Sequence, residues 1–559
     1  MNRKKQYFYL ALLWLIVMLP NLLLILIGED SVVASGLKKI VFFILCGVLI
    51  SLPLSFLKPK YFGWLTIVLF PFIVFELSMI YFYKAPSSEE SINLLFLTNY
   101  HEASELLKGN LQIVLYTIIF LFIIVWLSTK LKKEFKLFKK QKIAIGILSI
   151  VIIGILYIRN VNAASKLHDN WSETMGLANF SLNVQFGKVF PLDIAMKINS
   201  VSNGLKKRKA YKQNIKNFKF GAVKNDTLKE PEIYVLVIGE TARKHNFSIY
   251  NYSRKTTPYL DTIKNVIPYT NVSSAANLTS ISIPFILTRA TPNNLEAKFN
   301  EPAVINAFKE AGFKTYWITN QSIGVGSVFG FYSSLADVYK NTAISLDAAT
   351  YDDAIFPVLD SILQDTSNSK KFIVIHTIGS HFRYNYRYPE TFNQFKPALT
   401  RGLSLESTTS LSNKQALVNS YDNSILYTDY VLKSFIEQLK SKRSNAFLYY
   451  ISDHGENLYD DDKNKLLHGF VTPTKYEFEI PLIIWTSDKY NKNYTQKVAD
   501  LKRNQHLKIS SINTFNTLLD MANISYPLEI KQQSFADSTF NKNQHRYLYN
   551  TNGKVIKLD

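Results

Sequence analysis

Long apolar stretches dominate the first 160 residues, whereas short apolar runs alternate with amphipathic segments after residue 231. Five stretches in the first part are each about as long as a helix that crosses the hydrocarbon core of a membrane. They cover roughly residues 7–27, 40–57, 62–82, 111–127 and 143–158, with Glu76 as the one acidic residue inside a span. A cleaved signal peptide could account for the first stretch but not for the four that follow. The pattern predicts five transmembrane helices.

The basic residues between these stretches predict the orientation. Residues 3–5 are basic, Lys58 and Lys60 separate the second and third stretches, and the lysine-rich segment 130–142 joins the fourth and fifth. Lysine and arginine near spans are retained on the cytoplasmic side of the membrane. We therefore expect a cytoplasmic N-terminus and an exported chain after about residue 160.

The second half has the pattern of an α/β domain. Continuous apolar runs that predict buried strands cover residues 233–240, 315–321, 372–381, 446–456 and 480–485. Helical patterns, such as those of residues 301–313 and 421–441, lie between them. This alternation predicts a parallel sheet covered on both faces. We expect a transmembrane domain at residues 1–160, a connector with interfacial helices at 161–230 and a catalytic domain at 231–559.

The net charge of +21 raises nucleic-acid binding as an alternative function. Much of the excess lies in segments 130–142 and 204–220, the second of which follows the membrane domain directly. A basic amphipathic stretch at that position favours anionic lipid head groups. We therefore expect no nucleic-acid partner. Because the single cysteine, Cys46, lies inside a predicted span, the exported domain can form no disulfide.

Ionisable side chains follow several of the predicted strands. Glu240 ends the first strand, His376 and His381 lie at the end of the third, and Asp453 and His454 follow the fourth. The carboxyl ends of parallel strands form the crevice where such sheets bind ligands. A helix cap or a surface histidine could explain each residue alone. Together they indicate a zinc site, because zinc accepts carboxylate and imidazole ligands.

Six motifs resemble those of the lipopolysaccharide phosphoethanolamine transferases, a family of the alkaline phosphatase and sulfatase superfamily. They are residues 239–260, 277–284, 375–389, 421–432, 452–460 and 466–469, in this order along the chain. The resemblance covers nearly the whole chain. It implies five transmembrane helices in the bacterial inner membrane and a periplasmic α/β domain of alkaline phosphatase/sulfatase type.

The resemblance also implies roles for particular residues. Glu240, Asp453 and His454 are expected to bind zinc, and Thr279 is expected to be both the nucleophile and the remaining ligand. Ser280 and Ser282 are the rival nucleophiles.

His381 and His468 are expected beside the phosphoryl group, where they hold phosphate oxygens, transfer protons or bind a second zinc ion. Thr98 and Glu102 match the segment that recognises the donor head group. An asparagine expected four positions before that threonine is absent, and Leu94 stands there.

The implied reaction moves phosphoethanolamine from phosphatidylethanolamine to Thr279 and then to a lipopolysaccharide acceptor, either a core sugar or a lipid A phosphate. The lack of disulfides favours the branch that modifies core sugars. We expect a monomer, and a role in either antimicrobial peptide resistance or envelope integrity. The alternatives are a glycerol-phosphate transferase of the lipoteichoic acid synthase type and a non-catalytic envelope protein. A sulfatase is disfavoured because Ile286 stands where its motif requires arginine.

Overall fold

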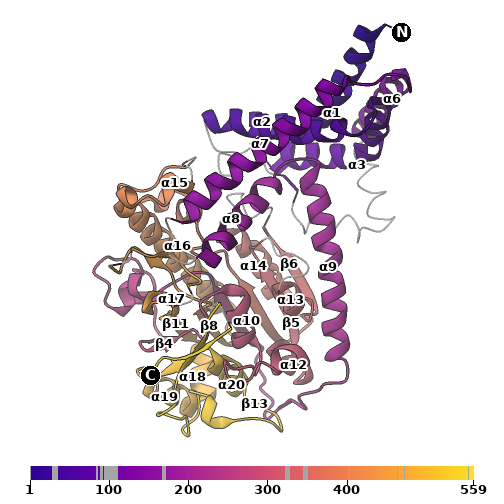
Figure 1. Cartoon of the computed structure of the whole chain (residues 1–559). Helices are drawn as coiled ribbons and strands as arrows, with labels where there is room; N and C mark the ends of the chain where they lie inside the picture. The colour runs from indigo at the N-terminus through magenta and orange to yellow at the C-terminus, as the bar shows by residue number, and fades with distance from the viewer. Residues whose placement is uncertain are drawn as a thin grey trace. The chain divides into compact units, whose positions relative to one another are not determined.

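The computed structural model describes most of the chain. The described residues are 2–27, 36–83, 86–87, 92, 111–165, 171–321, 328–343, 351–401, 403, 405–462, 464–470, 472–551 and 553–559. They form two compact units, one built mainly from residues up to Ser202 and the other from most of the remainder. Figure 1 shows the helices of the first unit in indigo and purple. The domain boundaries expected at residues 160 and 230 stay predictions.

The first unit is helical. Its helices are α1 (Arg3–Ile27), α2 (Leu37–Ser51), α3 (Pro59–Tyr83), α6 (Leu111–Lys130), α7 (Lys139–Ala164), α8 (Trp171–Phe186) and the start of α9 (Leu192–Asn214). Among the described residues, four helical segments are long and apolar enough to cross a membrane: Arg3–Ile27, Leu37–Ser55, Pro59–Tyr81 and Lys139–Ala164. The helical membrane region is therefore confirmed.

The fifth predicted span coincides with α6. The side chains described for this helix, Leu115–Lys130, form an apolar stretch shorter than a membrane crossing requires. The count of five crossings is not confirmed. Helices α8 and α9 occupy the predicted connector, where one or two helices were expected.

The second unit is built on a seven-stranded sheet with the order β3-β11-β8-β2-β7-β5-β6. The strands are β2 (Glu232–Gly239), β3 (Val266–Tyr269), β5 (Lys314–Thr319), β6 (Val338–Asn341), β7 (Lys370–His376), β8 (Asn445–Ser452) and β11 (Leu482–Thr486). Strands β8, β2, β7, β5 and β6 run parallel to one another. The predicted α/β class is confirmed.

One strand corrects the expectation of a wholly parallel sheet. Strand β11, predicted from residues 480–485, pairs antiparallel with β8 on one side and with β3 on the other. The connection from β8 to β11 contains no long crossover helix, and parallel neighbours need such a crossover. The segment between β8 and β11 leaves the sheet and returns to it at the same edge. Strand β11 therefore runs in the opposite direction to β8.

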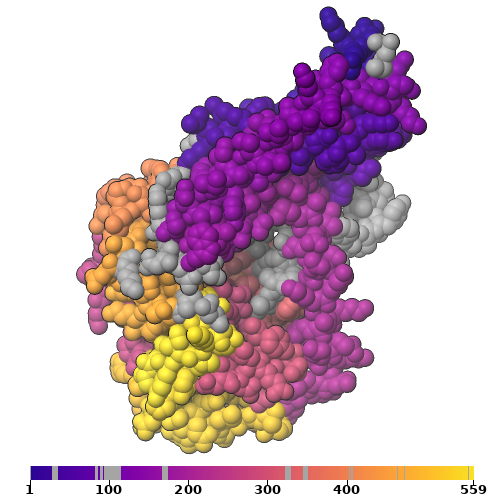
Figure 2. Space-filling view, viewed as in Figure 1, coloured from indigo at the N-terminus to yellow at the C-terminus, as the bar shows by residue number. Residues whose placement is uncertain are grey.

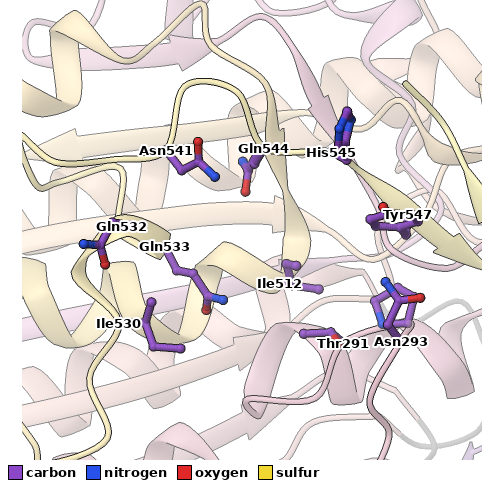
Figure 3. A pocket seen from close by; sticks show the side chains of 11 residues that line it. Thr291, Asn293, Ile512, Ile530, Gln532, Gln533, Asn541, Gln544, His545 and Tyr547 are labelled. Carbon is purple, nitrogen blue, oxygen red and sulfur yellow. The ribbon is translucent and has the colours of Figure 1, made fainter.

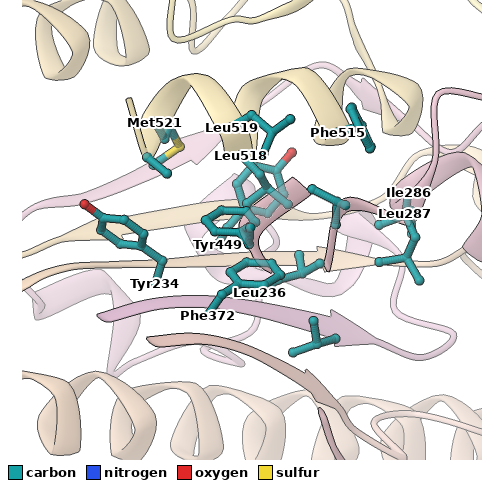
Figure 4. Packing of buried hydrophobic residues seen from close by; sticks show 14 of the residues in the cluster. Tyr234, Leu236, Ile286, Leu287, Phe372, Tyr449, Phe515, Leu518, Leu519 and Met521 are labelled. Atoms are coloured by element: carbon teal, nitrogen blue, oxygen red, sulfur yellow. The ribbon is translucent and has the colours of Figure 1, made fainter. Parts of the chain in front are cut away.

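Helices cover both faces of the sheet (Figure 4). Helices α10 (Thr279–Leu287), α12 (Val304–Glu310) and α20 (Thr514–Met521) contribute to one large apolar core. In Figure 4, Leu518 of α20 lies beside Tyr449 of β8, and Phe515 lies toward Ile286 and Leu287 of α10. Helices α14 (Phe356–Gln364) and α16 (Lys414–Ser441) pack against each other. Burial of these apolar side chains is the main force that fixes the strand ends in space.

Short elements complete the second unit. The helices are α11 (Ala297–Asn300), α13 (Val328–Ser333), α15 (Leu405–Thr408), α17 (Lys475–Phe478), α18 (Asp488–Asn493) and α19 (Thr495–Arg503). The paired short strands are β1 (Val223–Lys224) with β13 (Ile524–Ser525), β4 (Val272–Ser273) with β12 (Ile509–Ser510), β9 (Asn457–Leu458) with β10 (Leu466–Leu467), and β14 (Tyr547–Tyr549) with β15 (Val555–Lys557).

Candidate metal centre

Two neighbouring strands bring the predicted carboxylates together. Strands β2 and β8 are paired in register from end to end, with Gly239 opposite Ser452. Glu240 and Asp453 are the next residues on each strand, so both emerge at the carboxyl edge of the sheet. Hydrogen bonds from the backbone N–H of Asp453 to the carbonyl of Gly239, and from the N–H of Thr241 to Oδ1 of Asp453, fix this edge.

Glu240, Asp453 and His454 form a buried cluster whose ligand atoms all lie within 4.8 Å of one another. The Nε2 atom of His454 is 3.3 Å from Oδ2 of Asp453 and 3.7 Å from Oε1 of Glu240. All three side chains are almost completely inaccessible to solvent. The structure therefore brings together the three residues that the sequence predicts as zinc ligands.

Thr279 completes this cluster from the first turn of α10. Its hydroxyl donates to Oε1 of Glu240 at 3.1 Å and lies 2.9 Å from Nε2 of His454. The rival hydroxyls are placed differently: Ser280 is exposed, and Ser282 is buried and donates to the backbone carbonyl of Asp453. Of the three candidate nucleophiles, Thr279 is the one whose hydroxyl contacts the cluster side chains.

The cluster has the chemistry of a cation site. The Nδ1 atom of His454 lies 2.9 Å from the carbonyl of Gly455, to which it can only donate. Nδ1 therefore carries a proton, and Nε2, beside Thr279 and the two carboxylates, is the nitrogen that would bind a metal. Burial and the neighbouring Glu240 carboxylate raise the pKa of Asp453 to about 7.

The two carboxylates accept hydrogen bonds from hydroxyl, amide and backbone N–H groups, but one of their oxygens is left without a partner. Oδ2 of Asp453 is buried and makes no hydrogen bond among the described residues. Within the same part of the chain, the ion-pair contacts of Glu240 and Asp453 are with His454, and none is with lysine or arginine. Buried carboxylates without a cationic partner are costly unless they coordinate a metal. Carboxylate, imidazole and hydroxyl ligands of this kind fit zinc.

His468 adjoins the cluster, and its ring centroid is 4.0 Å from that of His454. Its Nδ1 atom lies 3.1 Å from Oε1 of Glu456. Burial, followed by the proximity of His454, lowers the pKa of His468 to about 3. The ring is therefore neutral near pH 7, with Nε2 left for a ligand.

His381 follows β7 at the same sheet edge. Its Nδ1 atom donates to the carbonyl of Phe382 at 2.6 Å, and its own carbonyl accepts from Nε of Arg387. Burial lowers the pKa of His381 to about 4. Its neutral ring therefore carries the lone pair on Nε2. The head-group residues Thr98 and Glu102 lie outside the described residues, so their role stays a prediction.

Two residues that make polar contacts in the site, Gln321 and Glu456, are not among the site residues predicted from the sequence. Nε2 of Gln321, which lies just beyond β5, donates to Oε2 of Glu240 at 3.0 Å and to the carbonyl of Thr377 at 2.8 Å. Glu456 orients His468. The rule that strand ends carry site residues could have identified Gln321. No pattern in the sequence links Glu456 to a residue 12 positions away.

A separate cavity of about 400 Å³ contains none of the predicted site residues. Side-chain amides such as Gln532, Gln533 and Gln544 line it together with Thr291 and Tyr547 (Figure 3). Figure 2 shows the yellow C-terminal residues beside the pink residues near position 300, which line a neighbouring cavity of about 420 Å³. Neither cavity is lined by a residue of the metal cluster.

The sheet, the carboxylate and histidine cluster at its carboxyl edge, and the adjoining threonine hydroxyl define an α/β domain of the alkaline phosphatase/sulfatase class. Accordingly, this chain belongs to the sulfatase family, because the family model described as Sulfatase matches residues 232–524. Membership in this family concerns the fold. Position 286 is isoleucine and not the arginine that a sulfatase motif requires.

Named relatives identify the branch. Phosphoethanolamine transferase EptC of Escherichia coli strain K12 is 29% identical over 496 residues, which cover 85% of this chain and 82% of that protein. The crystal structure of the periplasmic domain of that bacterium's EptC, in complex with Zn, is 30% identical and covers 60% of this chain and 94% of that domain, with a TM-score of 0.54. The predicted resemblance to phosphoethanolamine transferases is confirmed.

A solved structure of an integral membrane protein shares the fold. The integral membrane protein lipooligosaccharide phosphoethanolamine transferase A of Neisseria meningitidis covers 93% of this chain and 97% of that protein, with a TM-score of 0.50. At 19% identity the likeness concerns the fold alone. A helical membrane region followed by a sulfatase-type domain is thus found in a known protein.

Proposed function

We propose that this protein is a zinc-dependent transferase that moves phosphoethanolamine from phosphatidylethanolamine to a lipopolysaccharide acceptor. The observation that carries the proposal is the position of the Thr279 hydroxyl, within hydrogen-bonding distance of both Glu240 and His454. The relatives are phosphoethanolamine transferases, which indicates phosphoethanolamine as the transferred group and favours this reaction over glycerol-phosphate transfer. The intact cluster argues against a non-catalytic protein.

Glu240, Asp453, His454 and the Thr279 oxygen would hold one zinc ion. When bound, zinc supplies positive charge that favours deprotonation of a hydroxyl and offsets charge on a phosphoryl group. Thr279 lies at the first turn of α10, where helix N–H groups add a favourable field for an anion.

In the first step, the oxygen of Thr279 attacks the phosphorus of phosphatidylethanolamine. A bond forms between phosphorus and Thr279, the bond to diacylglycerol breaks, and the proton lost by Thr279 is matched by the proton that diacylglycerol gains. A threonine hydroxyl is a weak nucleophile unless its proton is removed or its oxygen is activated. The carboxylate of Glu240, which accepts a hydrogen bond from the Thr279 hydroxyl at 3.1 Å, holds that oxygen in a fixed direction.

In the second step, a hydroxyl or phosphate of the acceptor takes the group from Thr279. His381 is suited to receive the acceptor proton, because its Nδ1 donates to a backbone carbonyl and its Nε2 carries a lone pair. His468 would hold phosphoryl oxygens, or together with His381 bind a second zinc ion. Separate attacks on donor and acceptor give a ping-pong cycle.

Membrane anchorage fits substrates that are themselves lipids. We propose five crossings, with α6 as the fourth, a cytoplasmic N-terminus and a periplasmic catalytic domain in the inner membrane. Thr98 and Glu102 would contact the donor head group. The EptC relatives and the absence of disulfides favour a core sugar over a lipid A phosphate as the acceptor. A monomer is the expected state.

Mass spectrometry tests the proposal. Detergent-purified, zinc-loaded protein is incubated with phosphatidylethanolamine, and wild type is compared with Thr279→Ala and Ser280→Ala. We expect one phosphoethanolamine group on Thr279 in the wild type and in Ser280→Ala, and none in Thr279→Ala or after chelation. Absence of the adduct in wild type, or transfer of glycerol phosphate instead, would overturn the assignment.

A further inference from the structure

The short helix α17 lies against the loops that carry the candidate catalytic residues. Within it, Glu477 is completely buried. Its Oε1 atom accepts the N–H of Thr474 at 3.0 Å, which closes a capping box at the start of the helix. This local role uses one of its two carboxylate oxygens.

The other oxygen of Glu477 joins two segments that are far apart in the sequence. Oε2 accepts Nδ2 of Asn277 at 2.7 Å, the N–H of Gly469 at 3.0 Å and the N–H of Phe470 at 3.1 Å. Asn277 precedes Thr279 by two residues, and Gly469 directly follows His468. One carboxylate oxygen therefore binds the nucleophile segment and the histidine segment at once.

A second bond strengthens this link. The Nδ2 atom of Asn277 also donates to the carbonyl of Phe470 at 2.8 Å, so the amide bridges the carboxylate and the histidine segment. Asn277 is buried, like Glu477. Hydrogen bonds to a buried charged group are stronger than those between neutral groups, and breaking one leaves its partner unsatisfied.

The backbone of α17 reaches a third segment. The carbonyl of Glu477 accepts the N–H of Gly455, the residue after His454, at 2.7 Å. A side chain at position 455 would place its Cβ only 2.1 Å from the carbonyl oxygen of Tyr476, so the two backbones can approach this closely only with glycine there. The carbonyl of Phe478 accepts the N–H of Ser274.

We propose that Glu477 is a positioning residue that sets the distance between Thr279 and His468 for phosphoryl transfer. The inference rests on the proposed function, and the side chain of Glu477 bonds to none of the proposed zinc ligands. Its negative charge holds the two segments at one point while its backbone holds the segment of His454. Misplacement of reacting groups by about 1 Å can reduce a rate roughly 100-fold.

The substitution Glu477→Gln tests the inference in the full-length protein. An amide keeps the size of the side chain but replaces one acceptor oxygen with a donor and removes the charge. We expect the zinc content to stay at the wild-type level. The rate of adduct formation on Thr279 should fall roughly 10- to 100-fold, through kcat and with the KM for phosphatidylethanolamine unchanged. Asn277→Ala, which removes the bridging amide, should act in the same direction.

Asp429→Asn is the matched control. Asp429 of α16 is also a buried carboxylate that accepts backbone N–H groups, from Tyr259 at 2.8 Å and Leu260 at 3.0 Å. Its partners carry none of the candidate catalytic residues. We expect this variant to lower the thermal midpoint while leaving the adduct rate of each folded molecule unchanged.

Binding of inorganic phosphate separates this inference from the proposed function. Isothermal titration of zinc-loaded protein should show phosphate affinity reduced roughly tenfold in Glu477→Gln and unchanged in Asp429→Asn. If wild type forms no phosphoethanolamine adduct but this difference holds, the transferase assignment fails and the positioning role stands. If adduct rate and phosphate affinity in Glu477→Gln match those of wild type at equal folded fraction, Glu477 has only a structural role.

Discussion

Each of the two units buries a cluster of ionisable side chains, and the two clusters are compensated differently. In the helical unit, Glu76 and Asp193 share Lys197, whose Nζ atom lies 2.7 Å from Asp193 and 3.7 Å from Glu76. The backbone N–H of Ser87 donates to both oxygens of Glu76. This cluster carries its own cation.

The cluster of Glu240, Asp453 and His454 in the α/β unit also contains two carboxylates. Its third member is a histidine, whereas the third member of the helical cluster is a lysine. One oxygen of Asp453 has no hydrogen-bond partner among the described residues. The comparison teaches that a buried acidic pair alone does not identify a metal site. A buried acidic pair without lysine or arginine, beside an imidazole whose Nε2 faces it, is the stronger candidate for a metal site.

The largest effect is expected for Lys197→Met. This substitution leaves Glu76 and Asp193 buried without a cation, and breaking a buried ion pair costs about 3–5 kcal/mol. We expect the free energy of unfolding in detergent to fall by about that amount, with zinc content per folded molecule unchanged. Lys206→Met, at an exposed position of the same helix, is the control. Equal stability of the two variants would show that Lys197 does not compensate the acidic pair.

The next largest effect concerns the metal. Zinc sites bind with about 10–16 kcal/mol from four ligands, or roughly 2.5–4 kcal/mol for each. Asp453→Asn should therefore weaken zinc binding roughly 100- to 1000-fold, as measured by competition with a chelator. Because the change removes one of two neighbouring buried charges, the metal-free variant should be at least as stable as metal-free wild type. A loss of stability as large as that of Lys197→Met would contradict the contrast between the clusters.

The smallest effect is expected for Gln321→Ala. Its amide orients Glu240 from outside the ligand set, and loss of such a partner costs roughly 10- to 100-fold in metal affinity. Chelator competition measures the change, and Gln532→Ala, at an exposed position, serves as the control. If zinc affinity is the same in both variants, the hydrogen bond from Gln321 does not orient the ligand.

Much of the fold could be predicted because its signals are local. Apolar stretches of membrane-spanning length predicted helices such as α1 and α7, and continuous apolar runs predicted β2, β7 and β8. The direction of β11 could not be predicted from its own residues, since an apolar run has the same pattern in either direction.

Strand ends predicted a cluster of ionisable residues that includes Glu240, Asp453 and His454, because parallel strands bring their carboxyl ends to one edge, and the family resemblance then singled out these three as ligands. Thr279 came from the family resemblance, and the structure brings its hydroxyl to the cluster. The contacts of Glu477 could not be predicted from the sequence, because it lies in a helix of four residues and its partner Asn277 is 200 positions away.

The sequence by itself determined the helical membrane region, the α/β class and the residues that end its strands, because hydrophobic periodicity is a property of short segments. Only the tertiary structure decided how the buried charges are compensated. Lysine reaches Glu76 from another helix, whereas Glu240 and Asp453 meet histidine, threonine and glutamine. Compensation depends on distances between residues remote in the chain, and those distances are fixed only when the sheet and helices pack together.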